Sequence, residues 1–334
     1  MIGRTRAFTL LLIAATACSR GGTHGGPAAV AGKESGTPSV VELANATYSG
    51  IMNEPVTLIG GRWEGEPFVE GGASRPTVGL IDHFVLTGDL DGDGIDEAVT
   101  LLWESSGGSG TRLFLAAVAS GDNDIANLGT SLIGDPVQVR SGAIEDGQTT
   151  LDIIRAGPED AACCPTQKAL VTWALGEDGL LRVADETVGT LSLTDLEGRE
   201  WVLLELGRGQ PMPDDVEISM VFQDDRVSGS SGCNNYFAGV MAPNPGELAF
   251  NGMGATRMAC PEAVMGLERR YLRVLAGATG YTFLAGRLVL SCDTEDGLTT
   301  LVFGERKPHP TVSTANGWRP ATPGAFHRAG PEKV

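Results

Sequence analysis

The sequence lacks an apolar run long enough to cross a membrane, and it is poor in basic residues. A bilayer crossing takes about 20 consecutive apolar residues, and the stretch from Phe8 to Ala15 is much shorter. The chain holds 24 Lys and Arg against 42 Asp and Glu, for a formal net charge of −18. This acidic balance argues against a nucleic-acid-binding protein and against a basic face that adheres to a membrane.

Histidine is also scarce. The chain has four, and only His83 lies in a segment expected to fold; His24 lies in a Gly-rich stretch, and His309 and His327 lie in a Pro-rich tail. A nucleophilic cysteine needs a base close by, so a Cys–His catalytic pair is disfavoured. No zinc-ligand spacing, catalytic triad or nucleotide-binding loop is present. We therefore predict a non-enzymatic protein.

The N-terminus has the three parts of an export signal. Arg4 and Arg6 precede the short apolar stretch, and Ala15-Thr16-Ala17 places small residues directly before Cys18. This order predicts a lipoprotein signal peptide over residues 1–17, with diacylglycerol and further acyl chains such as palmitate on Cys18. Several acyl chains give stable anchoring. The alternative is an ordinary secretory signal cut after Ala17.

Residues 18–39 are rich in Gly, Ala, Ser and Pro, which predicts a flexible tether. The expected location is therefore the cell envelope, with the membrane as a partner through the lipid and the folded part facing the periplasm or the exterior. Ser19 favours the outer membrane if the host is Gram-negative. Removal of residues 1–17 also removes two Arg and takes the formal net charge to −20.

Five cysteines remain after Cys18, in a compartment where disulfides form. Because five is odd, at least one thiol is free or pairs with another molecule. Cys163 and Cys164 are adjacent and could form a strained vicinal disulfide. The alternatives are bridges to two different partners, or two free thiols.

The folded part is predicted to be a β-rich α+β structure with two domains. Residues 40–188 form the first, a mainly antiparallel β domain in which Gly, Asp and Ser separate short apolar runs. Residues 193–305 form the second, and residues 306–334, with five prolines from Pro308 on, form a disordered tail. The runs expected to be strands in the first domain are Val56–Ile59, His83–Thr87, Ala98–Trp103, Leu113–Val118 and Leu170–Trp173.

The segment Gly88–Glu97 predicts a calcium-binding loop. Its candidate ligands are the carboxylates of Asp89, Asp91, Asp93 and Glu97 together with the carbonyl of Ile95. Calcium takes 6–8 oxygen ligands, and Gly94 permits the sharp turn that folds such a loop around an ion. The ion would be structural. An acidic hairpin turn without metal is the alternative.

The loop is not an EF-hand, because Thr100 stands where the bidentate Glu is needed. It resembles the strand–loop–strand calcium loops of FG-GAP-type repeats, although only one copy is visible, which disfavours a propeller. Together with Asn45–Tyr48, Gly107–Thr111 and Cys163–Gln167, it looks like a recurrent region of secreted bacterial proteins that has no established activity.

The C-terminal domain carries a more specific pattern. Its elements are an opening Trp201, the motif Ser231-Gly232-Cys233-Asn234 followed by Tyr236, the segment Thr256–Cys260, a helical stretch, and the apolar run Leu288–Leu290. In this order and spacing they resemble the META domain family, to which the heat-shock-associated protein HslJ belongs. Asn235 departs from the Arg that the family usually has. The resemblance implies antiparallel strands wrapped around one helix, an envelope role in stress or antibiotic tolerance, and no established reaction.

The helix of this domain should begin with Pro261 in its first position, which places Cys260 at the N-cap. A thiol at a helix N-terminus can be acidified and reactive. We instead expect Cys233 and Cys260 to form a disulfide or to be core thiols. Cys292 is then the cysteine without an expected partner.

We thus expect binding, assembly or stress protection, through an unidentified envelope protein or small ligand and with no nucleic acid. The alternatives are a hydrolase or redox enzyme that uses Cys163-Cys164 or Cys260, and a protease inhibitor or ligand carrier. The only expected cofactor is Ca²⁺.

Overall fold

Antiparallel strands dominate the chain, which confirms the predicted β-rich class. The computed structural model describes residues 36–108, 110–121, 125–161 and 164–306. Cys18, Cys163, most of the predicted tether and all but the first residue of the predicted tail lie outside these ranges. Within them, no helix combines the length and the apolar character that crossing a membrane requires.

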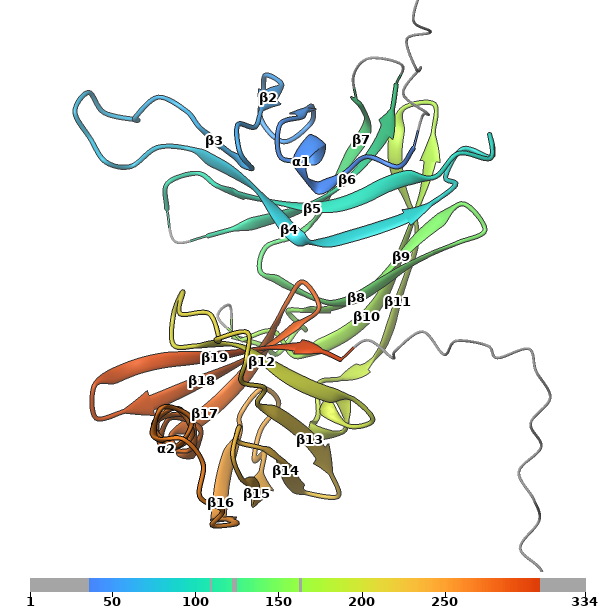
Figure 1. Cartoon of the computed structure of the whole chain (residues 1–334). Coiled ribbons are helices and arrows are strands. Elements are labelled where there is room, and N and C mark those ends of the chain that lie inside the picture. The colour runs from blue at the N-terminus through green and yellow to red at the C-terminus, as the bar shows by residue number, and fades with distance from the viewer. Residues whose placement is uncertain (1–35, 109, 122–124, 162–163, 307–334) are drawn as a thin grey trace, which may run out of the picture. The chain divides into compact units, whose positions relative to one another are not determined.

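A five-stranded and a four-stranded sheet make up the N-terminal half (Figure 1). The first has the strand order β3-β4-β5-β6-β7 and the second β11-β10-β9-β8. The bounds are β3 (Arg62–Glu64), β4 (Thr77–Gly88), β5 (Glu97–Ser105), β6 (Arg112–Ser120), β7 (Ile125–Gly134), β8 (Val137–Glu145), β9 (Gln148–Arg155), β10 (Gln167–Gly176) and β11 (Gly179–Thr190).

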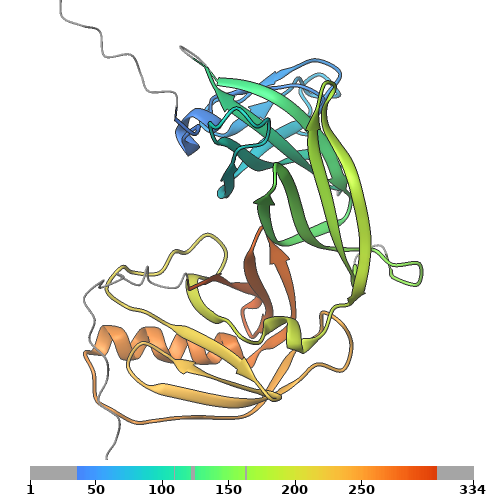
Figure 2. The same cartoon turned by 90° about the vertical axis from the view of Figure 1, so that its right-hand side faces the viewer.

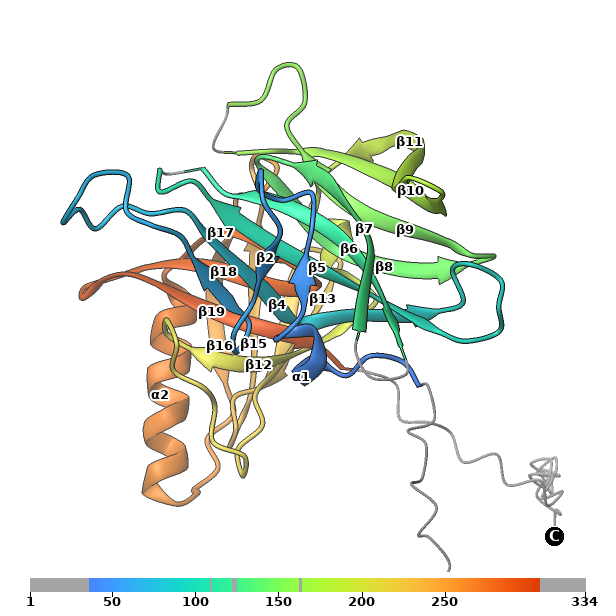
Figure 3. The same cartoon turned by 90° about the horizontal axis from the view of Figure 1, so that it is seen from above.

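The five-stranded sheet is covered on both faces. One face packs on the four-stranded sheet, where Leu101 and Leu115 share a core with Leu151 and Trp173. The other is covered by the short helix α1 (Val40–Leu43) and the pair β1 (Thr47–Tyr48) and β2 (Val56–Thr57) (Figures 1 and 3). A strand buried on both faces has a nearly continuous apolar sequence instead of an alternating one. This explains the apolar stretch of β6 and that of β5, which the buried Thr100 interrupts.

An eight-stranded antiparallel sheet and one long helix make up the C-terminal half. The helix α2 (Glu262–Ala276) packs on this sheet (Figure 2) and contributes Tyr271 and Leu275 to its core. The strand order is β16-β15-β14-β13-β12-β19-β18-β17. The bounds are β12 (Glu200–Leu206), β13 (Ser219–Gln223), β14 (Arg226–Ser230), β15 (Asn235–Met241), β16 (Ala249–Ala255), β17 (Ala278–Leu284), β18 (Arg287–Thr294) and β19 (Gly297–Glu305).

The start of α2 differs from the expectation by one residue. Pro261 is the N-cap and not the first helical residue, because its ψ of 141° is extended and lies outside the helical region. Cys260 therefore precedes the cap, and it forms a disulfide with Cys233. The apolar face of α2 turns toward the sheet, where Leu267 and Val274 pack against the core beside Tyr271 and Leu275.

A hydrogen-bonded cluster fixes α2 to the Ser231–Asn234 motif. Glu268 accepts from the Ser231 hydroxyl at 2.7 Å, from the Asn234 backbone N–H at 2.9 Å and from the Asn234 side-chain amide at 3.0 Å. Burial alone would raise the pKa of Glu268, but these donors hold it below its usual value. The motif therefore has a structural role, because it supplies the donors for a carboxylate on the helix.

The two halves are joined through the 3-10 helix η1 (Leu193–Leu196). Its Asp195 accepts from Arg140 Nη1 of β8 and from Lys168 Nζ of β10, each at 2.7 Å. The other oxygen of Asp195 accepts from the Ser192 backbone N–H at 2.8 Å. The connector is therefore tied to the four-stranded sheet by charge-assisted hydrogen bonds, which are stronger than neutral ones.

Glu268→Gln should destabilise the protein by about 1.5–3 kcal/mol, the range for hydrogen bonds to a charged group. Urea unfolding followed by circular dichroism measures the change. Glu262→Gln is the matched control on the same helix. Its ion pair with Arg269 is exposed, and such pairs contribute about 0–1 kcal/mol. Equal effects of the two substitutions would contradict a structural role for the cluster.

Candidate metal centre

The acidic loop of residues 89–96 closes the hairpin of β4 and β5. Gly88 and Glu97 are cross-strand partners at the point where the loop begins and ends. Gly92 and Gly94 both have positive φ, 82° and 87°, a conformation that other residues adopt only at a cost. The glycines thus allow the chain to turn tightly enough for the loop carboxylates to face inward.

Hydrogen bonds within the loop orient two of the aspartates. Asp89 accepts from the backbone N–H of Gly92 at 2.6 Å and from that of Gly94 at 3.0 Å. Asp91 accepts from the backbone N–H of Asp93 at 3.1 Å. A carboxylate has about four lone-pair sites, so both side chains keep oxygen lone pairs that can bind a cation.

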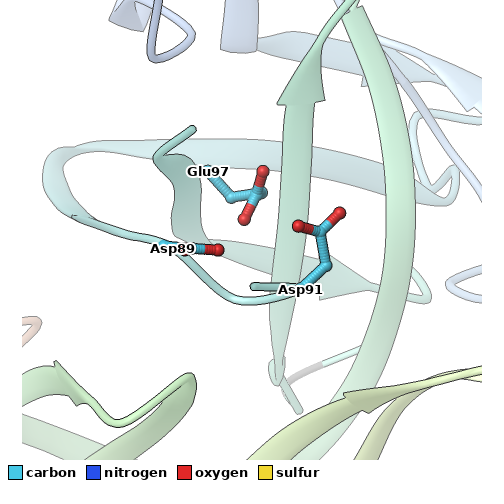
Figure 4. A group of neighbouring side chains, drawn as sticks. All are labelled: Asp89, Asp91 and Glu97. Atoms are coloured by element: carbon cyan, nitrogen blue, oxygen red, sulfur yellow. The ribbon is translucent and has the colours of Figure 1, made fainter. Parts of the chain in front are cut away.

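Three carboxylates converge in this loop. Asp89, Asp91 and Glu97 each place an oxygen within 4.8 Å of the others (Figure 4). Glu97 is buried, with 3% of its surface exposed, and its Oε2 accepts from the Leu90 backbone N–H at 2.8 Å. Burial and then the neighbouring aspartate charges raise the pKa of Glu97. A buried carboxylate beside other carboxylates is costly unless a cation neutralises it.

The donor set fits a hard divalent cation. Carboxylate oxygens are the ligands that calcium prefers, in a flexible shell of 6–8 oxygens. Of the predicted ligands, Asp93 does not lie within the converging group, and its Oδ1 accepts from the Ile95 backbone N–H at 2.7 Å. Asp93 and the Ile95 carbonyl therefore stay predictions, while Asp89, Asp91 and Glu97 are brought together.

The cysteines of the C-terminal half are not in a nucleophilic state. Cys233 and Cys260 form a disulfide, and Cys292 is a buried free thiol. Burial raises the pKa of Cys292 to about 12, so at neutral pH it stays a thiol and not the nucleophilic thiolate. In the N-terminal half Cys164 is disulfide-bonded.

A second feature was not expected from the sequence. The register of β4 and β5 shifts between Ile81 and Val85, so that Asp82, His83 and Phe84 bulge out of the ladder. The Thr100 hydroxyl donates to the Phe84 carbonyl at 3.0 Å and satisfies part of the interrupted pairing. A bulge redirects side chains and is common beside binding sites. The isolated His83 was the only sequence signal here.

Comparison with known proteins identifies one part of the chain. Residues 194–306 match the family model of the META domain. No curated protein matches the chain. One similar solved structure is an NMR structure of a protein from Burkholderia xenovorans, 26% identical, covering 35% of this chain and 87% of its own, with a TM-score of 0.29. Another NMR structure is 25% identical and covers 34% of this chain and 94% of its own, with a TM-score of 0.28.

Glu97→Gln should stabilise the metal-free protein at neutral pH. Folding raises the pKa of Glu97, so the folded protein is destabilised at a pH above the pKa that Glu97 has in the unfolded state. As the pH falls, Glu97 becomes protonated in both states and this destabilisation disappears. We expect a rise in Tm of roughly 2–4 °C at pH 7, which corresponds to about 1 kcal/mol, and a smaller change at pH 4. Thermal unfolding in EDTA measures both.

Asp96→Asn is the control for this experiment. It removes the same charge from an exposed residue of the same loop that lies outside the converging group, and it should change Tm little at either pH. No gain in Tm at pH 7 for Glu97→Gln would contradict the electrostatic cost assigned to that residue.

Proposed function

We propose that this chain is a lipid-anchored protein of the cell envelope that acts by binding, and that a calcium ion stabilises its N-terminal β domain. The observation that carries the proposal is the convergence of Asp89, Asp91 and Glu97 around a buried carboxylate. The ion supplies the positive charge that this cluster needs. Bound there, it ties the end of β4 to the start of β5.

Binding is favoured over catalysis by the state of the cysteines. The competing hypothesis of a hydrolase or redox enzyme needs a reactive thiolate at Cys260 or at the Cys163-Cys164 pair. Cys260 and Cys164 are each engaged in a disulfide, and the pKa of Cys292 lies far above neutrality. A disulfide-bonded sulfur has no thiolate to attack with, and a thiol of raised pKa is a poor nucleophile at neutral pH.

The META domain at residues 194–306 supports a role of the kind that the family implies. That role is stress or antibiotic tolerance in the cell envelope, exerted through an unidentified envelope protein or a small ligand. The lipid anchor rests on the N-terminal sequence alone, where small residues precede Cys18 after a short apolar stretch. The tether of residues 18–39 would let the folded part reach a partner while the lipid stays in the membrane.

Calcium should raise the Tm of the purified mature protein in detergent. A ligand at 100 times its Kd contributes about 2.7 kcal/mol, or roughly 5–10 °C in a protein of this size. Differential scanning fluorimetry with CaCl₂ or with EDTA measures the shift. Magnesium should act less, because it requires a stricter octahedral shell and gives up its water reluctantly.

Two substitutions test whether that shift comes from the loop. Asp91→Asn should abolish most of the calcium-dependent rise in Tm, while Asp96→Asn should retain it. The calcium assignment is wrong if the wild-type Tm is the same with calcium and with EDTA, or if Asp91→Asn responds as the wild type does.

Cys18→Ser should abolish lipid attachment. Cells grown with radiolabelled palmitate should label the wild type and the control Cys292→Ser, but not Cys18→Ser, because only a thiol at position 18 can receive the diacylglycerol. Immunoprecipitation and autoradiography measure the label. An unlabelled wild type that is processed normally would instead support a secretory signal cut after Ala17.

A further inference from the structure

A groove of about 970 Å³ lies along the bulged part of β4. Its floor and walls are largely apolar, from Leu80, Ile81, Trp103, Leu113 and Val137, with Leu284 of β17 at one side. Its polar lining comes from Asp82, His83, Thr111 and Asp135. Pockets that bind small molecules have this character, an apolar lining with a few placed polar groups, and volumes of about 300–1,000 Å³.

The position of Trp103 depends on a glycine on the neighbouring strand. Gly79 is its cross-strand partner, and a Cβ atom on Gly79 would lie 2.4 Å from the indole. The ring can therefore lie against the backbone of β4 only because residue 79 has no side chain. A large aromatic side chain that is fixed before binding loses little entropy when a ligand packs on it.

The bulge brings polar groups to the groove. It removes Asp82 and His83 from the strand ladder, and Asp82 Oδ1 lies 3.5 Å from His83 Nδ1. His83 Nε2 lies 3.3 Å from the carbonyl oxygen of Leu284. Burial and the charge of Arg287 lower the pKa of His83, so His83 is neutral at pH 7 and does not cancel the charge of Asp82.

The charge of the lining is negative. Asp82 and Asp135 are exposed at the groove. Two nearby cations have carboxylate partners of their own, although Arg112 also interacts with Asp135 and the Arg62 guanidinium lies 5.7 Å from the centroid of the Trp103 ring. Arg112 pairs with Glu104 at 2.6 Å, and Arg62 pairs with Glu64 at 2.8 Å. Arg287 lines a neighbouring cavity of about 400 Å³ that shares His83. A ligand here therefore meets an apolar surface and two carboxylates.

We propose that this groove binds a small amphipathic cation, a molecule with an apolar or aromatic body and an ammonium or guanidinium group. The apolar body would pack on Trp103 and the adjoining aliphatic side chains, and the cationic group would pair with Asp82 and Asp135. This deepens the proposed binding function, on which it rests, by naming the chemical class of the ligand.

Three probes that differ mainly in charge test the proposal. They are 1-naphthylmethylamine, a cation at neutral pH, the neutral 1-naphthylmethanol, and the anion 1-naphthoate. The mature protein with ¹⁵N-labelled tryptophan is titrated with each, and NMR follows the indole N–H signals. We expect the amine to shift the Trp103 signal saturably, with about tenfold higher affinity than the alcohol, the effect of roughly one favourable charge contact. The anion should not bind.

Charge variants locate the binding. The double variant Asp82→Asn and Asp135→Asn should bind the amine no better than the alcohol. The control Asp178→Asn, which removes one charge from an exposed turn of the same half, should keep the preference. Trp173 lies buried in the core between the two N-terminal sheets, so an unchanged Trp173 signal shows that the half carrying the substitutions is folded.

The proposal is overturned if no probe shifts the Trp103 signal, if the anion binds as well as the amine, or if the preference for the amine survives the double substitution. The calcium-dependent Tm and the palmitate label are measured on the same protein. If calcium raises the Tm and palmitate labels the protein but no probe binds, the proposed ligand class is wrong and the proposed function is unaffected. If neither the calcium shift nor the palmitate label is found but the amine binds, the proposed function is wrong and the ligand proposal is supported.

Discussion

The burial of β5 and β6 on both faces is the constraint on which the rest of the N-terminal half depends. Each strand contributes side chains to two cores, so neither can shift without opening one of them. Two irregular segments lie at the ends of these strands and on their neighbour β4. The acidic loop occupies one such end, and the bulge interrupts β4. A rigid scaffold therefore positions two irregular segments, the arrangement in which binding sites commonly occur.

In the C-terminal half, the helix α2 covers the sheet and completes the core. Burial of Tyr236 against Tyr271, whose hydroxyls lie 2.7 Å apart, joins a strand to α2 through a polar contact inside an apolar core. A buried hydroxyl without a partner would be destabilising, and here each serves the other. The Ser231–Asn234 motif and Glu268 are a second example, in which buried polar groups are each other's hydrogen-bond partners. Both sets of contacts join α2 to the strands and so fix its orientation.

The sequence predicted what depends on local chemistry and missed what depends on partners distant in the chain. The apolar runs at 98–103 and 113–118 became β5 and β6, and the calcium-like spacing placed Asp89, Asp91 and Glu97 together. In contrast, β11 was not expected, because ten of its twelve residues are exposed and leave no apolar pattern. The bulge in β4 and the place of Trp103 on Gly79 were also missed, since both arise from pairing between strands and no single segment encodes them.

The disulfide between Cys233 and Cys260 also bears on when the protein becomes stable. It closes a stretch of chain with a sequence separation of 27 that includes β15 and β16. Restricting the unfolded chain over such a length contributes about 3–4 kcal/mol in the chain-entropy model, a large share of the 5–15 kcal/mol by which proteins are typically stable. A newly made chain with reduced thiols lacks that contribution and unfolds more readily. The C-terminal domain therefore gains this part of its stability only once the two thiols are oxidised.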